Sequence, residues 1–192
     1  MIEDKVVRHI EAAGSQRSFG TSMTAKAPYH GDGAGQHLTA ESGELEELLG
    51  LFVAHHAAKL RLCDDLEAIA DSLPERAGPR ECLAAARTVN GILRGAHEFE
   101  EAQLWPVLLR LRCDDRELCD SLERLRYEHW EDESYAEEVA AVLTDWGMCV
   151  GNRNAEATGY LLRGFFEGLR RHVAFEREHL VPILRSALGS DR

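Results

Sequence analysis

The sequence of 192 residues contains no run of eighteen apolar residues, so no transmembrane helix is expected. Its first residues, MIEDKVVRHI, include acidic side chains and lack the apolar core of a signal peptide, which predicts a cytoplasmic protein. Basic residues are also in deficit, because 22 Lys and Arg stand against 34 Asp and Glu. The formal net charge of −12 argues against nucleic acid or an anionic membrane as a partner.

The cysteines lack the pattern of a disulfide framework or of a thiolate zinc site. They are five in number, scattered, and none forms a Cys-x-x-Cys pair. Branched apolar residues are scarce over residues 14–36, where Gly, Ser and Thr are frequent. We therefore predict a mostly disordered N-terminal tail over residues 1–43 and one folded domain over residues 44–188, which is long enough for a sizeable core.

Strand patterns are almost absent after residue 43, and apolar residues recur there at helical spacing. Four helices are expected over residues 44–73, 79–113, 114–147 and 155–188. Pro79 suits the first turn of the second helix, and the sequence from Asp114 to Glu117 resembles a capping box at the start of the third. Four amphipathic helices joined by short connections predict an all-α, up-down-up-down four-helix bundle.

Three of these helices carry a histidine and a glutamate four residues apart in the middle of the apolar stripe. The pairs are His97 with Glu101, His129 with Glu133, and His172 with Glu176. A buried carboxylate without a partner costs several kcal/mol, and a bound cation removes this cost because side chains at i and i+4 can contact the same ion. The first helix has His55 and His56 at its middle, and periodicity slightly favours His55, seven residues before Leu62.

Two segments repeat a His-x-x-x-Glu helix that runs into a proline, HEFEEAQLWP from His97 and HVAFEREHLVP from His172. With LRYEHWEDE around His129 and HHAAKLRLCDDLEAI in the first helix, the chain resembles the hemerythrin-like (HHE cation-binding) domain proteins of the bacterial single-domain type over residues 45–188. The resemblance implies a left-handed four-helix bundle that holds two non-haem iron ions with an oxo or hydroxo bridge. It also selects His56 rather than His55 as the ligand from the first helix.

Carried over residue by residue, the resemblance implies a metal site built from all four helices. The implied ligands are His56, His97, His129, His172, Glu101 and Glu176. Oxygen-carrying members have a second histidine where this chain has Glu133, which we add to the ligands; a site richer in carboxylate favours the ferric state over reversible oxygen carriage. Glu98 is an alternative ligand. Pro106 and Pro182 are expected to bend or end their helices away from the metals.

The predicted function is that of a non-haem di-iron binding protein that binds or senses oxygen, nitric oxide or peroxide, or that handles iron. A di-iron enzyme that decomposes peroxide is one alternative, and a metal-free or zinc-binding helical interaction module is another. A ferritin-like oxidase is disfavoured because that class uses Glu-x-x-His. The expected partner is a small diatomic or peroxide ligand, with no nucleic acid and no membrane; the residues indicate no particular protein partner.

Overall fold

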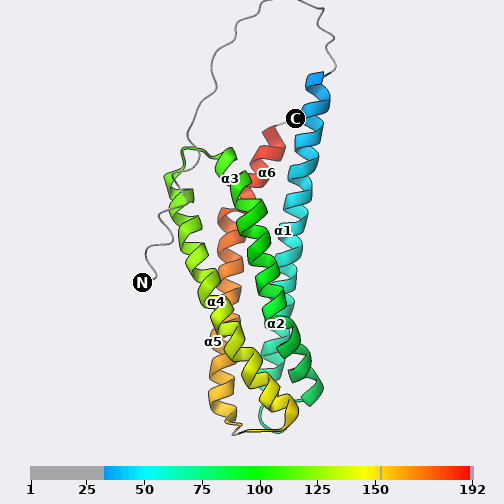
Figure 1. The fold of residues 1–192 in the computed structure, drawn as a ribbon, viewed down its shortest axis with the longest axis vertical. Helices are drawn as coiled ribbons and strands as arrows, with labels where there is room; N and C mark the ends of the chain where they lie inside the picture. Colours follow the sequence, from blue (N-terminus) through cyan, green and yellow to red (C-terminus); the bar gives the residue numbers. More distant parts are fainter. Residues whose placement is uncertain (1–32, 152, 191–192) are drawn as a thin grey trace, which may run out of the picture. The chain divides into compact units, whose positions relative to one another are not determined.

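The computed structural model describes residues 33–151 and 153–190, and in this part of the chain all regular structure is helical. The elements are α1 (Gly33–Ser72), α2 (Pro79–Phe99), the π-helical turn η2 (Glu100–Leu104), α3 (Trp105–Leu111), α4 (Arg116–Met148), α5 (Ala155–His179) and α6 (Val181–Ser190). Because α2, η2 and α3 follow one another without a gap, and α5 and α6 nearly so, they form four long rods (Figure 1). None of the helices described is both long and apolar enough to cross a lipid bilayer.

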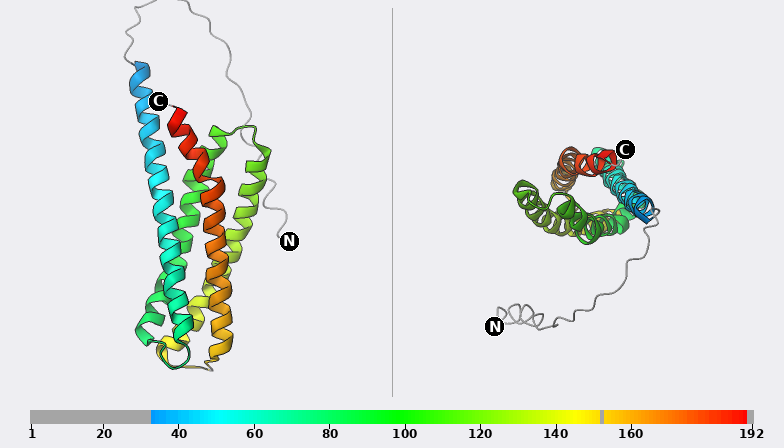
Figure 2. Two further views of the ribbon diagram at one scale, coloured as in Figure 1. Left: turned by 180° about the vertical axis from the view of Figure 1, so that it is seen from behind. Right: turned by 90° about the horizontal axis from the view of Figure 1, so that it is seen from above.

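The rods run alternately up and down along the bundle, and the view along its axis shows them arranged around a centre (Figure 2). Side-chain interactions join neighbouring rods in turn. They link α2 to α4, α4 to α5 and α5 to α1 through Arg94 and Glu137 at 2.7 Å, the Tyr135 hydroxyl and the Leu161 carbonyl at 3.1 Å, and Arg170 and Asp64 at 2.8 Å. The predicted up-down-up-down four-helix bundle is confirmed.

Helix α1 begins at Gly33, within the segment that the sequence analysis assigned to a tail over residues 1–43. Residues 1–32 lie outside the described residues. The earlier start is understandable, because a helix that is already formed gains a hydrogen bond for each further residue it fixes. Gly and Thr between residues 33 and 43 lower helix propensity but do not forbid the helix.

The ends of α4 follow from local chemistry. A carboxylate oxygen of Asp115 accepts a hydrogen bond from the Leu118 N–H at 3.0 Å, so Asp115 caps the helix. The cap lies one residue later than in the predicted capping box, in which Asp114 would pair with Glu117. At the other end, Cys149 takes the left-handed conformation, with φ of 57°. Gly147 lies in the last turn, where a Cβ atom would come within 2.5 Å of the Leu83 side chain. The glycine therefore allows α4 to approach the start of α2 closely.

Pro106 and Pro182 each interrupt the rod in which they lie, as predicted. Before Pro106 the helix widens into η2, where the Trp105 N–H donates to the Glu100 carbonyl five residues earlier. Pro106 has no N–H for the carbonyl of residue 102, and its ring crowds the preceding turn, which accounts for the local change. In the fourth rod α5 ends at His179, and Pro182 lies in the first turn of α6.

The hydrophobic core consists of two clusters with a polar layer between them along the bundle axis. The larger cluster includes Leu62, Leu93, Leu143 and Leu169. The smaller cluster, towards α3 and α6, includes Phe52, Leu104, Leu125 and Leu180. Along every rod the sequence passes from one cluster to the other through the polar layer, so the fold places its buried polar groups at mid-height.

Candidate metal centre

The polar layer is made of buried side chains from all four rods, each on the apolar stripe of its helix. Its members are His56 and Lys59 of α1, His97 of α2, Glu100 of η2, His129 of α4, and His172 and Glu176 of α5. All of them are at most 4% exposed. The structure therefore brings together the four histidines that the sequence analysis put forward as ligands.

Ligand atoms converge on one side of this layer. Those of His97, His129 and His172 lie within 4.8 Å of one another, and so do those of Glu100, His129, His172 and Glu176. The Nε2 atoms of the three histidines, one oxygen of Glu100 and one of Glu176 are buried without a hydrogen-bond partner. Because buried polar atoms are nearly always paired, unpaired ligand atoms in these two overlapping groups, which share His129 and His172, fit a bound cation.

The outer ring nitrogens of two histidines are held by carboxylates. Nδ1 of His97 donates to Glu133 at 3.0 Å, and Nδ1 of His129 donates to Glu101 at 2.8 Å. With the proton on Nδ1, each ring directs the lone pair of Nε2 into the centre. A carboxylate behind the ring is typical of metal-bound histidine, where it fixes both the tautomer and the orientation.

His172 has two acidic neighbours of the same kind. Its Nδ1 lies 3.3 Å from a carboxylate oxygen of Glu128 and 3.7 Å from one of Asp132. Burial would lower the pKa of His172, but the nearby carboxylates of Glu128 and Glu176 outweigh burial and raise that pKa to about 9. In the metal-free protein this ring is therefore an imidazolium, protonated on both nitrogens, at neutral pH. One of these protons must leave before the ring can bind a metal ion.

His97, in contrast to His172, is neutral. Burial, and after it the neighbouring His129 ring, lowers the pKa of His97 to about 2. The two rings are stacked, with centroids 3.9 Å apart. A neutral imidazole is the form that binds metal, so His97 is ready to act as a ligand without losing a proton.

Lys59 is a member of the layer that the sequence analysis did not single out. Its Nζ donates to Glu100 at 2.8 Å and to Glu176 at 3.3 Å, and its side chain is fully buried. Burial alone would lower the pKa of Lys59, but the charges of Glu176 and Glu100 outweigh burial and raise it. The signal was present in the sequence, because Lys59 lies seven residues after Phe52 on the apolar stripe of α1.

Glu100 lies inside the layer, whereas Glu101 and Glu133 lie at its rim. The side chain of Glu100 is fully buried, and those of Glu101 and Glu133 are 35% and 33% exposed. A spacing of four after His97 indicates Glu101, so Glu100, which follows at a spacing of three, was not predicted. Glu176 is buried at the spacing of four that the sequence indicated.

The choice between the two histidines of α1 has a geometric answer. His56 is buried, and its Nε2 lies 3.2 Å from an oxygen of Glu176. His55 is half-buried and stacks on Phe99, with ring centroids 5.0 Å apart. His56 is therefore the one in the polar layer. Glu98, the alternative ligand, is exposed on α2.

Two features border the centre. The indole of Trp105, at the start of α3, stacks on His129 with ring centroids 5.2 Å apart and so closes one side. Between α4 and α5 lies a cavity of about 430 Å³ whose lining reaches His172 together with Glu128, Asp132 and Phe175. His172 is the polar-layer residue that borders this cavity.

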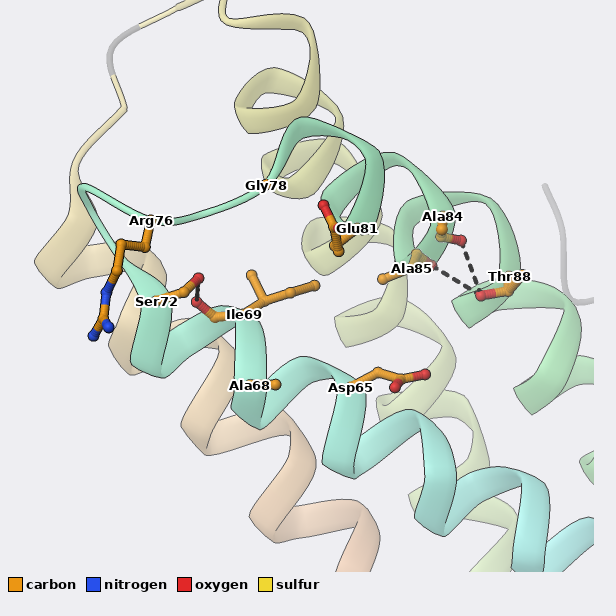
Figure 3. A pocket seen from close by; sticks show the side chains of 10 residues that line it. All are labelled: Asp65, Ala68, Ile69, Ser72, Arg76, Gly78, Glu81, Ala84, Ala85 and Thr88. Carbon is orange, nitrogen blue, oxygen red and sulfur yellow. Dashed lines mark hydrogen bonds between the residues drawn. The ribbon is translucent and has the colours of Figure 1, made fainter.

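Another cavity, of about 590 Å³, lies between the end of α1 and the start of α2 (Figure 3). Its lining is Asp65, Ala68, Ile69, Ser72, Arg76, Gly78, Glu81, Ala84, Ala85 and Thr88. Thr88 and Ser72 bond to carbonyls of their own helices. None of the polar-layer residues lines this cavity, so it is separate from the centre.

Comparison with known proteins agrees with the geometry. The family model described as the Hemerythrin HHE cation binding domain matches residues 47–184, and this range includes every residue of the polar layer. No curated protein and no solved structure matches the chain. With a match over most of its length, the chain belongs to the hemerythrin HHE cation-binding domain family.

Proposed function

We propose that this protein binds iron at the polar layer and that the bound iron binds a small ligand such as oxygen, nitric oxide or peroxide. The observation that carries the proposal is the group of five buried, unpaired ligand atoms. They belong to His97, His129, His172, Glu100 and Glu176. Imidazole nitrogen and carboxylate oxygen suit divalent first-row ions, and membership of the hemerythrin family favours iron among them.

The proposed ligand set differs from the sequence-derived set in its carboxylates and in leaving out His56, which is not grouped with the converging ligand atoms. Glu100 takes the place of Glu101, because it presents an unpaired oxygen to the centre while Glu101 bonds to the back of His129. Glu133 likewise bonds to the back of His97 and orients it. Oriented rings lose little freedom when an ion binds, which strengthens binding.

The cavity beside His172 supports the small-ligand part of the proposal. Its volume of about 430 Å³ exceeds what a diatomic molecule or peroxide needs, and it opens between α4 and α5 next to a proposed ligand. The indole of Trp105 covers the His129 ring of the centre. A small ligand would therefore reach the iron past His172, while the apolar clusters above and below exclude bulk water.

Metal analysis of the aerobically purified full chain tests the iron site. We expect bound iron in the wild type and its loss in His172→Ala, because this variant removes one of three imidazoles. His179→Ala is the matched control, since His179 lies two turns further along the same helix and is exposed. Zinc in place of iron, no metal, or unchanged iron in His172→Ala would contradict the proposal.

Ligand binding is tested on the same three proteins after anaerobic reduction. Nitric oxide should change the optical spectrum of the wild type and of His179→Ala, and leave that of His172→Ala unchanged. An iron-loaded wild type whose spectrum does not respond to nitric oxide, oxygen or peroxide would contradict ligand binding and leave iron handling as the function.

A further inference from the structure

Lys59 places a positively charged ammonium group inside the buried polar layer. It is the only lysine in residues 33–192, and its side chain is fully buried on the apolar stripe of α1. Its Nζ contacts one oxygen of Glu100 at 2.8 Å and one of Glu176 at 3.3 Å. A buried ammonium is costly unless it is paired, and here two buried carboxylates pair with it.

The two carboxylates each face two ways. Glu100 directs Oε1 to Lys59 and Oε2 towards Nε2 of His129, at 3.0 Å. Glu176 directs Oε2 to Lys59 and Oε1 towards Nε2 of His172, at 3.5 Å. The oxygens on the Lys59 side have a hydrogen-bonded cation, whereas those on the histidine side have no hydrogen-bond partner. The carboxylates thus bridge two cation positions, one of which is filled by the side chain.

His56 belongs to the Lys59 side of the layer. Its Nε2 lies 3.2 Å from the same Glu176 oxygen that accepts from Lys59. Both ring nitrogens of His56 are buried without a hydrogen-bond partner. Glu100 and Glu176 contact the ammonium directly, and His56 contacts the Glu176 oxygen that the ammonium shares. One imidazole and two carboxylate oxygens are a donor set that a metal ion would use.

We propose that the Lys59 ammonium takes the place of the second metal ion, so that the centre holds one ion, on the side of His97, His129 and His172. This inference rests on the proposed iron site and replaces the two ions that the family resemblance implied by one. A divalent ion on the Lys59 side of Glu100 and Glu176 would have to displace Lys59 or lie against a like charge in a fully buried site, where screening is weak. One divalent ion and one ammonium already outweigh the charge of the two buried carboxylates.

Counting the iron bound by the full-length chain tests the inference. The metal-free protein is loaded anaerobically with excess ferrous iron, desalted, and analysed for iron per chain. We expect one iron in the wild type and a twofold increase in Lys59→Ala, because the vacated space is lined by His56, Glu100 and Glu176. Adding His56→Ala to Lys59→Ala should return the count to one.

Lys59→Arg is the matched control, because it keeps a positive charge at the same position and should keep one iron. Two irons in the wild type would overturn the inference and leave the proposed iron site intact. One iron in both the wild type and Lys59→Ala would overturn the role of Lys59. No iron in any protein would instead refute the proposed function itself.

A measurement on the wild type alone covers the case in which the variants do not fold. X-ray absorption at the iron edge detects a second iron through scattering at a separation of up to about 4 Å, the range that covers two-metal sites. We expect iron coordinated by imidazole and carboxylate with no iron neighbour at that separation. A clear iron–iron vector would overturn the inference.

Discussion

Glu133 stands behind His97 and holds its ring in place, with Arg94 lying 3.7 Å beyond it on the solvent side. Carboxylates in this position are partners of a metal ligand rather than ligands. The partly exposed Glu101 does the same for His129, with Arg126 at 3.5 Å. The histidines are therefore fixed by charged groups that reach outward through the bundle wall.

Replacing Glu133 by Ala tests this role. We expect the affinity for iron to fall by about 10- to 100-fold with the number of ions at saturation unchanged, because the ring keeps its lone pair but loses its orientation. Competition with a chelator of known affinity measures the change. Glu137→Ala is the control, since Glu137 lies one turn away on α4 and bonds to Arg94. Complete loss of iron at saturation would show that Glu133 is itself a ligand, as the sequence suggested.

Which acid enters the centre could be predicted only in part. Glu176 follows its histidine by four residues on a regular helix, and the pattern placed it in the layer. Glu100 was not predicted because a fixed spacing of four residues after His97 indicated Glu101. Lys59 escaped for a different reason, since a lysine between apolar residues is usually read as an exposed side chain whose stem covers the core. The burial of Lys59 is explained only by the two buried carboxylates that pair with it.

At the scale of the helices, the stability of α4 depends on the hydrogen bond that caps its first turn. Asp115 accepts from the Leu118 N–H, while the neighbouring Asp114 is exposed and makes no cap. We expect Asp115→Ala to lower the free energy of unfolding by about 1 kcal/mol, because a donor at the helix start loses its partner. Urea denaturation followed by circular dichroism measures it.

Asp114→Ala is the matched control for this substitution and should change the free energy of unfolding by less than about 0.5 kcal/mol. Equal effects of the two substitutions would show that charge near the helix start matters rather than the hydrogen bond to Leu118. No effect of Asp115→Ala would contradict the cap.

The four rods were predictable because each carries a long apolar stripe with a helical period, and the prolines and caps marked most of their ends. The start of α1 was not, since the residues from Gly33 to Gly43 have no apolar stripe. Pro106 indicated an interruption, but its form as the wide turn η2 depends on how α3 packs on α4 and α6. Sequence period alone carries no information on such packing.

For the whole bundle, the bound ion is expected to contribute to stability. Without it, buried histidine and carboxylate atoms between the two apolar clusters lack partners. Iron at about 100 times its dissociation constant should add about 2.7 kcal/mol, which corresponds to an increase in Tm of about 5 to 10 °C for a domain of this size. Thermal unfolding with and without a chelator measures the difference.

His172→Ala should show a much smaller change in Tm on chelation, because it holds little iron to remove. A wild-type Tm that is the same with and without iron would mean that the ion is bound too weakly to matter or that the layer is stable by itself. Either result would separate the iron site from the stability of the fold.

The division of the core into two clusters has a consequence for cooperativity. Each cluster is sealed by its own leucines and aromatic rings, and the rods between them are tied across the middle by the polar layer. Two adjacent cores unfold as one cooperative unit only when separating them costs more free energy than one core retains by staying folded without the other. In this bundle Lys59 and its two carboxylates lie at that junction, and the proposed ion would strengthen it. The polar layer therefore determines whether the two halves unfold together or in succession.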